Sequence, residues 1–208
     1  MYKRQGKVRY GLMLREDGIV MDDGTTARMS ENHFIMTTTT VNAESVYRHL
    51  EFCHQCLWPE MDVHLISTTD AWAQIAIAGP NSRKIVSKIV DKQFDVSNKN
   101  FPFMACKEIT ICGGIPARLF RISFSGELAY ELSIPTQYAS SLVSYLMEIG
   151  KDENIIPYGT EALGVMRIEK GHAAGAELNG TISAQNLNMG KMVSNKNCLL
   201  YTSDAADD

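Results

Sequence analysis

The sequence lacks the charge surplus that marks several specialised classes of protein. Its 20 Lys and Arg stand against 24 Asp and Glu, so the formal net charge is -4. Domains whose main partner is nucleic acid usually carry a basic surplus, and we therefore expect no such partner. A small anionic ligand needs only a local basic pocket, so the net charge leaves that class of ligand open.

Long apolar runs and a dense set of cysteines are also missing. No run approaches the roughly 20 apolar residues that span a bilayer, and residues 1–11 lack the apolar centre of a secretory signal. Five cysteines in a chain of 208 residues do not make a disulfide framework. These absences predict a reduced, cytoplasmic protein with no membrane partner.

What the sequence does contain is an ordinary globular composition, with 45% hydrophobic and 21% charged residues. The length suits one medium domain or two small lobes. Strand-like and helix-like patterns are mixed without strict alternation, and we find no internal repeat. This organisation predicts the α+β class.

The hydrophobic periodicity and the turn residues predict individual elements. The expected strands cover residues 8–14, 19–21, 25–29, 33–38, 63–67, 74–78, 106–112, 117–124 and 128–133. Helices are expected from a cap at Asn42 to Pro59, from Asn81 to about Val90, from a cap at Thr136 to about Ile149, and from about Gly159 to Lys170. The remainder, residues 176–193, is expected to be turn-rich with short strands.

A C-x-x-C pattern, Cys53 and Cys56, raises the possibility of a metal or redox site. Zinc would need two further ligands, and the spacing of Cys106 and Cys112 does not match a zinc finger. The helical phase places Cys53 on an apolar face, where a free cysteine behaves as a small hydrophobe. A structural role is therefore the favoured interpretation, and no metal is expected.

An acid pair and a single glutamate could carry chemistry. Asp22 and Asp23 follow an apolar strand, where paired acids are usually turn residues; the alternative is a carboxylate that faces a cationic substrate or accepts a proton. Glu131 alternates with apolar neighbours and could point inward. A buried acid is costly without donors, but the paired N–H groups of a pterin or guanine edge would supply them. The alternative is that Glu131 lies on an edge strand and its side chain is exposed to water.

An arginine on the last expected helix is the third candidate. Arg167 lies on a helix that is otherwise apolar on one face. It could pair with a neighbouring acid such as Glu161 or Glu169, or bind a ligand carboxylate through both arms of its guanidinium. The residue types alone favour neither interpretation.

A resemblance to one family is carried by six segments together, which are residues 9–23, 33–40, 78–84, 101–104, 118–132 and 157–171. They are similar to the aminomethyltransferases, the T-protein of glycine cleavage, and most specifically to the branch formed by sarcosine oxidase alpha subunits. The resemblance covers nearly all of residues 7–196.

The resemblance implies a fold and a division of the chain. The fold would be T-protein-like, with mixed antiparallel sheets and packed helices, truncated at both ends and lacking the C-terminal β-barrel. The expected divisions are a folate-binding domain at 6–197, with lobe one at about 6–60 and 155–197 and lobe two at about 61–154, and non-native ends at 1–5 and 198–208.

The resemblance also implies roles for individual residues. Asp22 matches the family's catalytic aspartate, and Glu131 matches the glutamate that binds the pterin. The residues implied to bind the cofactor are Thr39, Glu131, Tyr10, Phe124 and Arg167. Phe124 stands where a tyrosine is common in the T-protein, so any role of that hydroxyl is lost. The segment 171–178 departs from the family pattern in its small residues.

The function implied by the resemblance is transfer of a one-carbon unit. An imine formed by sarcosine oxidation would react with tetrahydrofolate and give 5,10-methylenetetrahydrofolate and glycine. FAD, FMN and NAD would belong to missing parts or other subunits, and the partners would be the beta, gamma and delta subunits. The chain alone would not oxidise amines. The alternatives are a T-protein-like aminomethyltransferase, a dimethylglycine dehydrogenase folate domain, or a folate-binding module without catalysis, which would not need Asp22.

Overall fold

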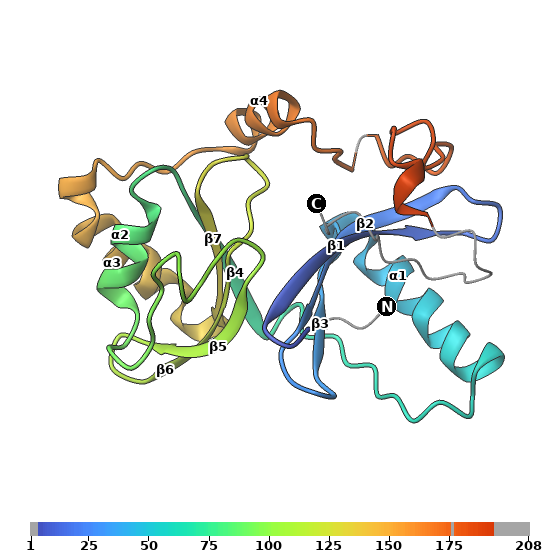
Figure 1. Ribbon diagram of the computed structural model, residues 1–208, viewed down its shortest axis with the longest axis horizontal. Helices are drawn as coiled ribbons and strands as arrows, with labels where there is room; N and C mark the ends of the chain where they lie inside the picture. The colour runs from blue at the N-terminus through green and yellow to red at the C-terminus, as the bar shows by residue number, and fades with distance from the viewer. Residues whose placement is uncertain (1–3, 176, 194–208) are drawn as a thin grey trace.

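The strands of the chain form two open antiparallel sheets in a computed structural model, which describes residues 4–175 and 177–193 (Figure 1). The first sheet contains β1 (Lys7–Leu14), β2 (Val20–Arg28) and β3 (Phe34–Met36) in that order. The second sheet has the spatial order β4 (Trp72–Ala78), β7 (Ala129–Pro135), β6 (Ile115–Phe120) and β5 (Cys106–Ile111). The α+β prediction is confirmed. The expected non-native tail at 198–208, and residues 1–3 of the expected non-native N-terminal end, lie outside the described residues.

Helices accompany both sheets. They are α1 (Ala43–Phe52), which continues into a π-helical turn (Cys53–Leu57), α2 (Ser82–Ile89), α3 (Ala139–Ile149) and α4 (Thr160–Lys170). In Figure 1, α2 and α3 cover one face of the second sheet, while α1 belongs to the first sheet. In the described part of the chain, no helix is long and apolar enough to cross a membrane.

The main core lies between the second sheet and its two helices. Tyr130, Leu132 and Ile134 alternate along β7 and have 0% exposure, because they point toward α2 and α3. Burying a side chain of this size contributes about 1.5–3 kcal/mol. The intervening residues of β7, Glu131 and Ser133, therefore point to the other face of the sheet.

A smaller core joins the two sheets. Val8 and Ala27 of the first sheet pack with Phe120, the last residue of β6, and with Ile122 just after it. The backbone reinforces this contact, since Val8 N–H donates to the carbonyl oxygen of Met104 at 2.8 Å. The uncovered face of the second sheet is thereby held toward the first sheet.

The register of β1 with β2 places the acid pair in the middle of a strand. Leu12 pairs with Asp23 and Met13 with Asp22. The expected strands at 19–21 and 25–29 form one strand, so the interpretation of Asp22 and Asp23 as turn residues is wrong. A continuous strand is possible here because Gly24 has no side chain: a Cβ at this position would lie 1.9 Å from the carbonyl oxygen of Thr37.

An irregularity in β2 decides which way the two acids face. Leu14 pairs with Val20 although Met13 pairs with Asp22, so Met21 is an extra residue in the strand. Such a bulge shifts the alternation of side chains between the two faces. As a result Asp23 lies on the same face as Leu12 and Leu14, and Asp22 on the opposite face.

Other element predictions need correction. Residues 63–67 form no strand; Val63 and Ile66 are exposed and have no partner strand to cover them. Leu57, expected in the buried face of α1, is 40% exposed, because the π-helical turn that begins at Cys53 changes the helical phase. Thr136 does not cap α3: its hydroxyl donates to the carbonyl oxygen of Asp70, and α3 begins three residues later.

The segment after α4 packs back onto the first sheet. Leu178 and Ala184 join Leu12, Leu14 and Val20 in a third buried cluster. Short strands were expected at 176–193; residue 176 lies outside the described residues, and residues 177–193 contain turns, one 3-10 helix (Gly190–Met192) and a single bridge from Ser183 to Ile19. This segment therefore covers the face of the first sheet that carries Asp23.

Candidate functional site

Asp22 is a fully buried carboxylate with three hydrogen-bond donors. Thr39 donates its backbone N–H to Oδ2 at 2.9 Å and its hydroxyl to Oδ1 at 2.7 Å. Asn42 donates its side-chain amide to Oδ1 at 3.0 Å. This bond explains why Asn42 precedes α1 without capping it through its side chain. The carboxylate ties β2 to the start of α1, and its exposure is 0%.

Asp23 points to the other face of the sheet and is half-buried. Its Oδ2 accepts a hydrogen bond of 2.7 Å from the hydroxyl of Tyr10. Burial raises the pKa of Asp23 above its ordinary value; the hydrogen bond from Tyr10 lowers it, the charge of Asp22 raises it, and His172 lowers it. Burial, together with Asp23, also raises the pKa of Tyr10. Asp23 is therefore a carboxylate whose protonation responds to its surroundings.

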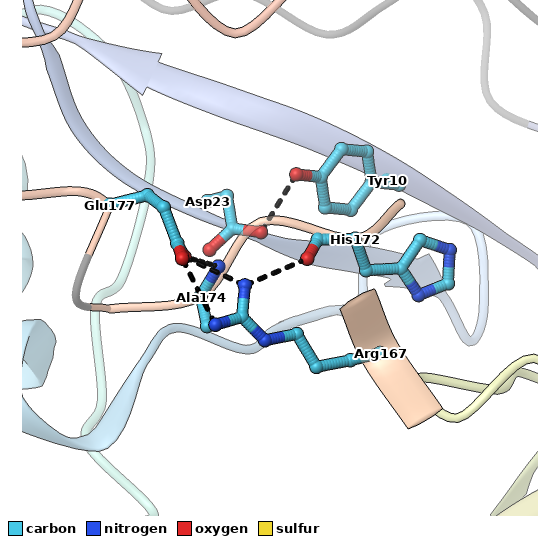
Figure 2. A network of polar contacts seen from close by, with 6 residues as sticks. All are labelled: Tyr10, Asp23, Arg167, His172, Ala174 and Glu177. Atoms are coloured by element: carbon cyan, nitrogen blue, oxygen red, sulfur yellow. Dashed lines mark hydrogen bonds and ion pairs between the residues drawn. The ribbon is translucent and has the colours of Figure 1, made fainter. Parts of the chain in front are cut away.

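The loop that follows α4 runs past Asp23 and is clamped by an ion pair (Figure 2). Arg167 donates to both carboxylate oxygens of Glu177, at 2.8 and 2.9 Å, and to the carbonyl oxygen of His172 at 3.2 Å. The backbone N–H of Ala174 also donates to Glu177, at 2.7 Å. The sequence predicted Glu161 or Glu169 as protein partners of Arg167; the partner is Glu177, which the loop brings back to the guanidinium.

Phe124 and His172 form a stacked pair beside this loop. Their ring centroids are 5.8 Å apart and the rings are inclined by 25°. A ring nitrogen of His172, Nδ1, lies 2.8 Å from the carbonyl oxygen of Phe124. Since Phe124 precedes β7 and His172 follows α4, this pair links the second sheet to the loop that passes Asp23.

Glu131 lies on the face of the second sheet that is turned away from α2 and α3. β7 is flanked by β4 and β6, so the edge-strand alternative is wrong. Gln74 of β4 donates a hydrogen bond to Glu131. Burial raises the pKa of Glu131 to about 7, and the hydrogen bond from Gln74 opposes that shift. Burial and the charge of Glu131 raise the pKa of Tyr158 as well.

The structure thus divides the predicted site residues among three places. Tyr10 binds Asp23, Phe124 and Arg167 contact the loop that follows α4 through His172 and Glu177, and Thr39 is bound to Asp22 on the other face. Glu131 belongs to the second sheet. The roles given to these residues by the resemblance stay predictions.

The sequence analysis did not identify four polar residues that lie in these three groups of side chains. They are Asp23 as a group facing the loop, His172, Glu177 and Gln74. The departure of segment 171–178 from the family pattern was a signal for His172 and Glu177. Gln74 and Asp23 could be found only from strand register.

The C-x-x-C pattern does not assemble a ligand set. The described part of the chain holds no group of three or more His, Cys, Asp or Glu side chains placed to bind a metal ion. Cys53 is buried and its Sγ lies 3.6 Å from Nε2 of His49, one helical turn away, while Cys56 is exposed.

Comparison with known proteins shows the family of the chain and several relatives within that family. Residues 1–197 match the family model described as "GCVT N-terminal domain", and the chain belongs to this family. A solved structure, the glycine cleavage system aminomethyltransferase T from Bartonella henselae, superposes with a TM-score of 0.71 at 20% identity, covering 87% of this chain and 45% of that one. This likeness confirms the T-protein-like fold.

Within the family, the chain is similar to sarcosine oxidase alpha subunits. It is 60% identical to that of Rhizobium meliloti (strain 1021) over 190 residues, which are 91% of this chain and 19% of the relative. The corresponding subunit of Corynebacterium sp. (strain P-1) is 45% identical over 91% of this chain and 20% of its own length. An aminomethyltransferase of Geobacillus sp. (strain WCH70) is 30% identical over 79% of this chain and 43% of its own length. The chain spans about a fifth of the length of the two sarcosine oxidase relatives.

Proposed function

We propose that this chain is the one-carbon-transfer domain of a sarcosine oxidase alpha subunit and binds tetrahydrofolate between its two sheets. The observation that carries the proposal is the environment of Glu131. Its carboxylate is half-buried, has one side-chain donor in Gln74, and lies on the sheet face turned from the core helices. A carboxylate has about four acceptor sites, so Glu131 has room for the paired N–H groups of a pterin edge.

In the proposed reaction, sarcosine is oxidised to an imine at a flavin outside this chain. The imine carbon then passes to tetrahydrofolate, the acceptor substrate, giving 5,10-methylenetetrahydrofolate and glycine. The similarity to sarcosine oxidase alpha subunits supports this substrate. The domain contributes by holding the two reactants together and by keeping water from the imine.

The geometry favours Asp23 over Asp22 as the carboxylate that acts on the reactants. The resemblance assigns the role to Asp22, but both oxygens of Asp22 are occupied by Thr39 and Asn42, and its exposure is 0%. Asp23 has one side-chain donor, Tyr10, and is half-buried on the face that Arg167 and its loop approach. An acid–base group must reach the proton that it moves, and the partial exposure of Asp23 supports its choice over the fully buried Asp22.

The wider assembly belongs to the same proposal. FAD, FMN and NAD would be held by other parts of the enzyme, and the beta, gamma and delta subunits would be its partners in the cytoplasm. The two-lobe division at about residues 60 and 155 would separate the Asp23 face from the Glu131 face. Arg167, engaged by Glu177, would shape the pocket wall, and Phe124 would line it beside His172.

Two measurements test the proposal. Tetrahydrofolate is titrated against the chain by calorimetry, with Glu131→Gln as the variant. Charge-assisted hydrogen bonds are worth about 1.5–3 kcal/mol each, so the variant should bind more than about tenfold more weakly. Ser133→Ala, on the same strand face, is the matched control and should bind as wild type. Equal affinity of wild type and Glu131→Gln would remove Glu131 from the site.

The second measurement asks for catalysis in a complete enzyme. The matching 190-residue segment of the Rhizobium meliloti alpha subunit is replaced by that of this chain, whose 60% identity favours a folded chimera. With sarcosine and tetrahydrofolate, the chimera should form 5,10-methylenetetrahydrofolate. A chimera that oxidises sarcosine but releases only formaldehyde, whatever the folate concentration, would contradict the proposed transfer.

A further inference from the structure

A strip of polar side chains runs along the face of the second sheet that holds Glu131. The register of β4 with β7 places Gln74 opposite Ser133 and Ala76 opposite Glu131. The register of β6 with β7 places Arg118 opposite Ser133 as well. Directly paired residues lie on the same face of a sheet, so all five side chains share this face. Two hydrogen bonds follow the strip: Gln74 donates to Glu131, and the hydroxyl of Ser133 donates to Oε1 of Gln74 at 3.5 Å.

The cation of Arg118 is held against an aromatic ring at the end of the strip away from Glu131. Its guanidinium carbon lies 3.8 Å from the centroid of the Trp72 ring. At this separation the two flat groups have room only to lie face to face, which is a favourable cation–π arrangement. The N–H groups of a guanidinium lie in its own plane. They therefore point past the indole and not into it.

The guanidinium of Arg118 is short of acceptors. Its Nε is buried and has no hydrogen-bond partner within residues 4–175 and 177–193. The carboxylate of Glu108, on the neighbouring strand β5, lies 3.9 Å from this nitrogen, which is too long for a hydrogen bond. Glu108 is 60% exposed, whereas the side chain of Arg118 is only 13% exposed. A cation with so little water around it is costly to hold unless a further acceptor binds it.

The two ends of the strip have opposite character. Glu131 is an acceptor at one end, and Arg118 on Trp72 is a donor at the other. Trp72 pairs with Pro135, four residues beyond Glu131, and at about 3.3 Å per residue the two ends lie about 13 Å apart. Tetrahydrofolate has the same order of groups, because its pterin presents N–H donors and its glutamyl tail presents carboxylates, with an aromatic ring and an amide between them.

We propose that Arg118, supported by Trp72, binds a carboxylate of the glutamyl tail of the folate. This inference rests on the proposed function and assigns the second end of its ligand. A guanidinium can hold a carboxylate through two parallel N–H bonds. The structural alternative is that Arg118 only ties β6 to β4 across β7 by stacking on Trp72. A carboxylate of the glycine unit is the other possible source, but the reaction takes place at the pterin, so that group would lie near Glu131.

The first test compares two ligands by calorimetry on the full chain. One is tetrahydrofolate; the other is the amide of tetrahydropteroic acid, which keeps the pterin and the aromatic ring but has no carboxylate. Wild type should bind tetrahydrofolate at least about tenfold more tightly than the amide. Arg118→Gln should remove this difference by weakening tetrahydrofolate alone, whereas Glu131→Gln should weaken both ligands alike.

Lys107 provides the matched control for Arg118. It lies on β5, pairs with the buried Leu119 and therefore belongs to the opposite face of the sheet. Its ammonium group also forms a cation–π contact, 5.3 Å from the centroid of the Phe94 ring. Lys107→Gln removes one positive charge and one such contact from the same sheet, and should keep the wild-type difference between the two ligands.

A second variant tests the proposal in the opposite direction. Glu108 is exposed and close to Arg118, so Glu108→Gln removes an anion that competes with the ligand and leaves the core intact. The affinity for tetrahydrofolate should rise by about two- to fivefold, the usual range for an exposed ion pair. The affinity for the amide should not change. Trp72→Phe keeps a flat ring beneath the guanidinium and should keep the difference between the ligands, whereas Trp72→Leu should reduce it.

The outcomes separate the two proposals. If wild type binds neither ligand, the proposed function fails and the role of Arg118 fails with it. If wild type binds both ligands equally, or if a folded Arg118→Gln weakens both by the same factor, the tail site is overturned while the proposed function stands. Loss of glycine binding in Arg118→Gln, with the difference between the two ligands kept, would also overturn it. If Arg118→Gln does not fold, an unchanged affinity of Glu108→Gln for tetrahydrofolate overturns the proposal.

Discussion

Asp22 and Asp23 are adjacent in the chain but lie in opposite environments. Asp22 has 0% exposure and three donors from Thr39 and Asn42. Asp23 has one donor, Tyr10, and burial raises its pKa. The first environment holds the carboxylate in place through hydrogen bonds to both of its oxygens, whereas the second leaves a carboxylate with a single side-chain donor. The comparison teaches that identical residue types in one strand can divide structural and chemical roles between its two faces.

The largest expected effect is on the rate of catalysis, which should depend on Asp23 and not on Asp22. In the chimeric enzyme, Asp23→Asn should lower the rate of 5,10-methylenetetrahydrofolate formation by about 10²–10⁴-fold, the usual contribution of a positioned acid–base group. Sarcosine oxidation at the distant flavin should continue, and free formaldehyde should rise. Product partition, measured by trapping formaldehyde, checks the result. An undiminished yield in Asp23→Asn, with a loss confined to a folded Asp22→Asn, would return the catalytic role to Asp22.

The second prediction separates the acids by stability. Asp22→Ala leaves the donors of Thr39 and Asn42 without their acceptor, so the free energy of unfolding should fall by about 3–5 kcal/mol. Asp23→Ala removes one half-buried acceptor and should cost only about 1 kcal/mol. Urea unfolding of the two variants side by side measures the difference. Equal losses would break the distinction between a structural and a chemical carboxylate.

The third prediction concerns Thr39, which the resemblance assigns to folate binding. Its hydroxyl donates to Asp22 at 2.7 Å. Thr39→Val should therefore lower the free energy of unfolding by about 1.5–3 kcal/mol and leave the affinity for tetrahydrofolate nearly unchanged. Thr39→Ser keeps the hydroxyl and serves as the control. If Thr39→Val weakens folate binding strongly at unchanged stability, the hydroxyl faces the ligand and the environment of Asp22 must be reinterpreted.

The smallest expected effect is a change of stability with pH that arises from Glu131 of the second sheet. Burial raises its pKa from 4.5 to about 7, so the folded chain keeps a proton that the unfolded chain releases. Its contribution to stability is complete below about pH 4.5 and is lost as the pH rises toward 7. Between pH 5 and 8, the urea midpoint should fall by an amount equivalent to about 1–3 kcal/mol, given 1.36 kcal/mol per pKa unit. Glu131→Gln should remove that part of the pH dependence; an identical profile would show that the carboxyl is ionised throughout.

Much of the local structure could be predicted from residue patterns. The strands of the second sheet and the end of α4 follow from local signals, since Gly171 takes the left-handed conformation that terminates a helix (φ 81). The alternation around Glu131 was also readable, because Tyr130 and Leu132 flank it on the core face, but the sequence did not show that Glu131 faces away from the core helices. By contrast, Val63 to Ser67 has strand-like composition but no partner, which no local pattern could reveal.

The sequence by itself determined the α+β class, the family and the presence of an acid pair, because these depend on composition, periodicity and long matching segments. The tertiary structure alone decided which acid faces Tyr10 and His172. That choice depends on a single extra residue, Met21, in the pairing of β2 with β1. A shift of one residue moves every following side chain to the other face of a strand, so the environment of each carboxylate is set by register, which only the assembled sheet defines.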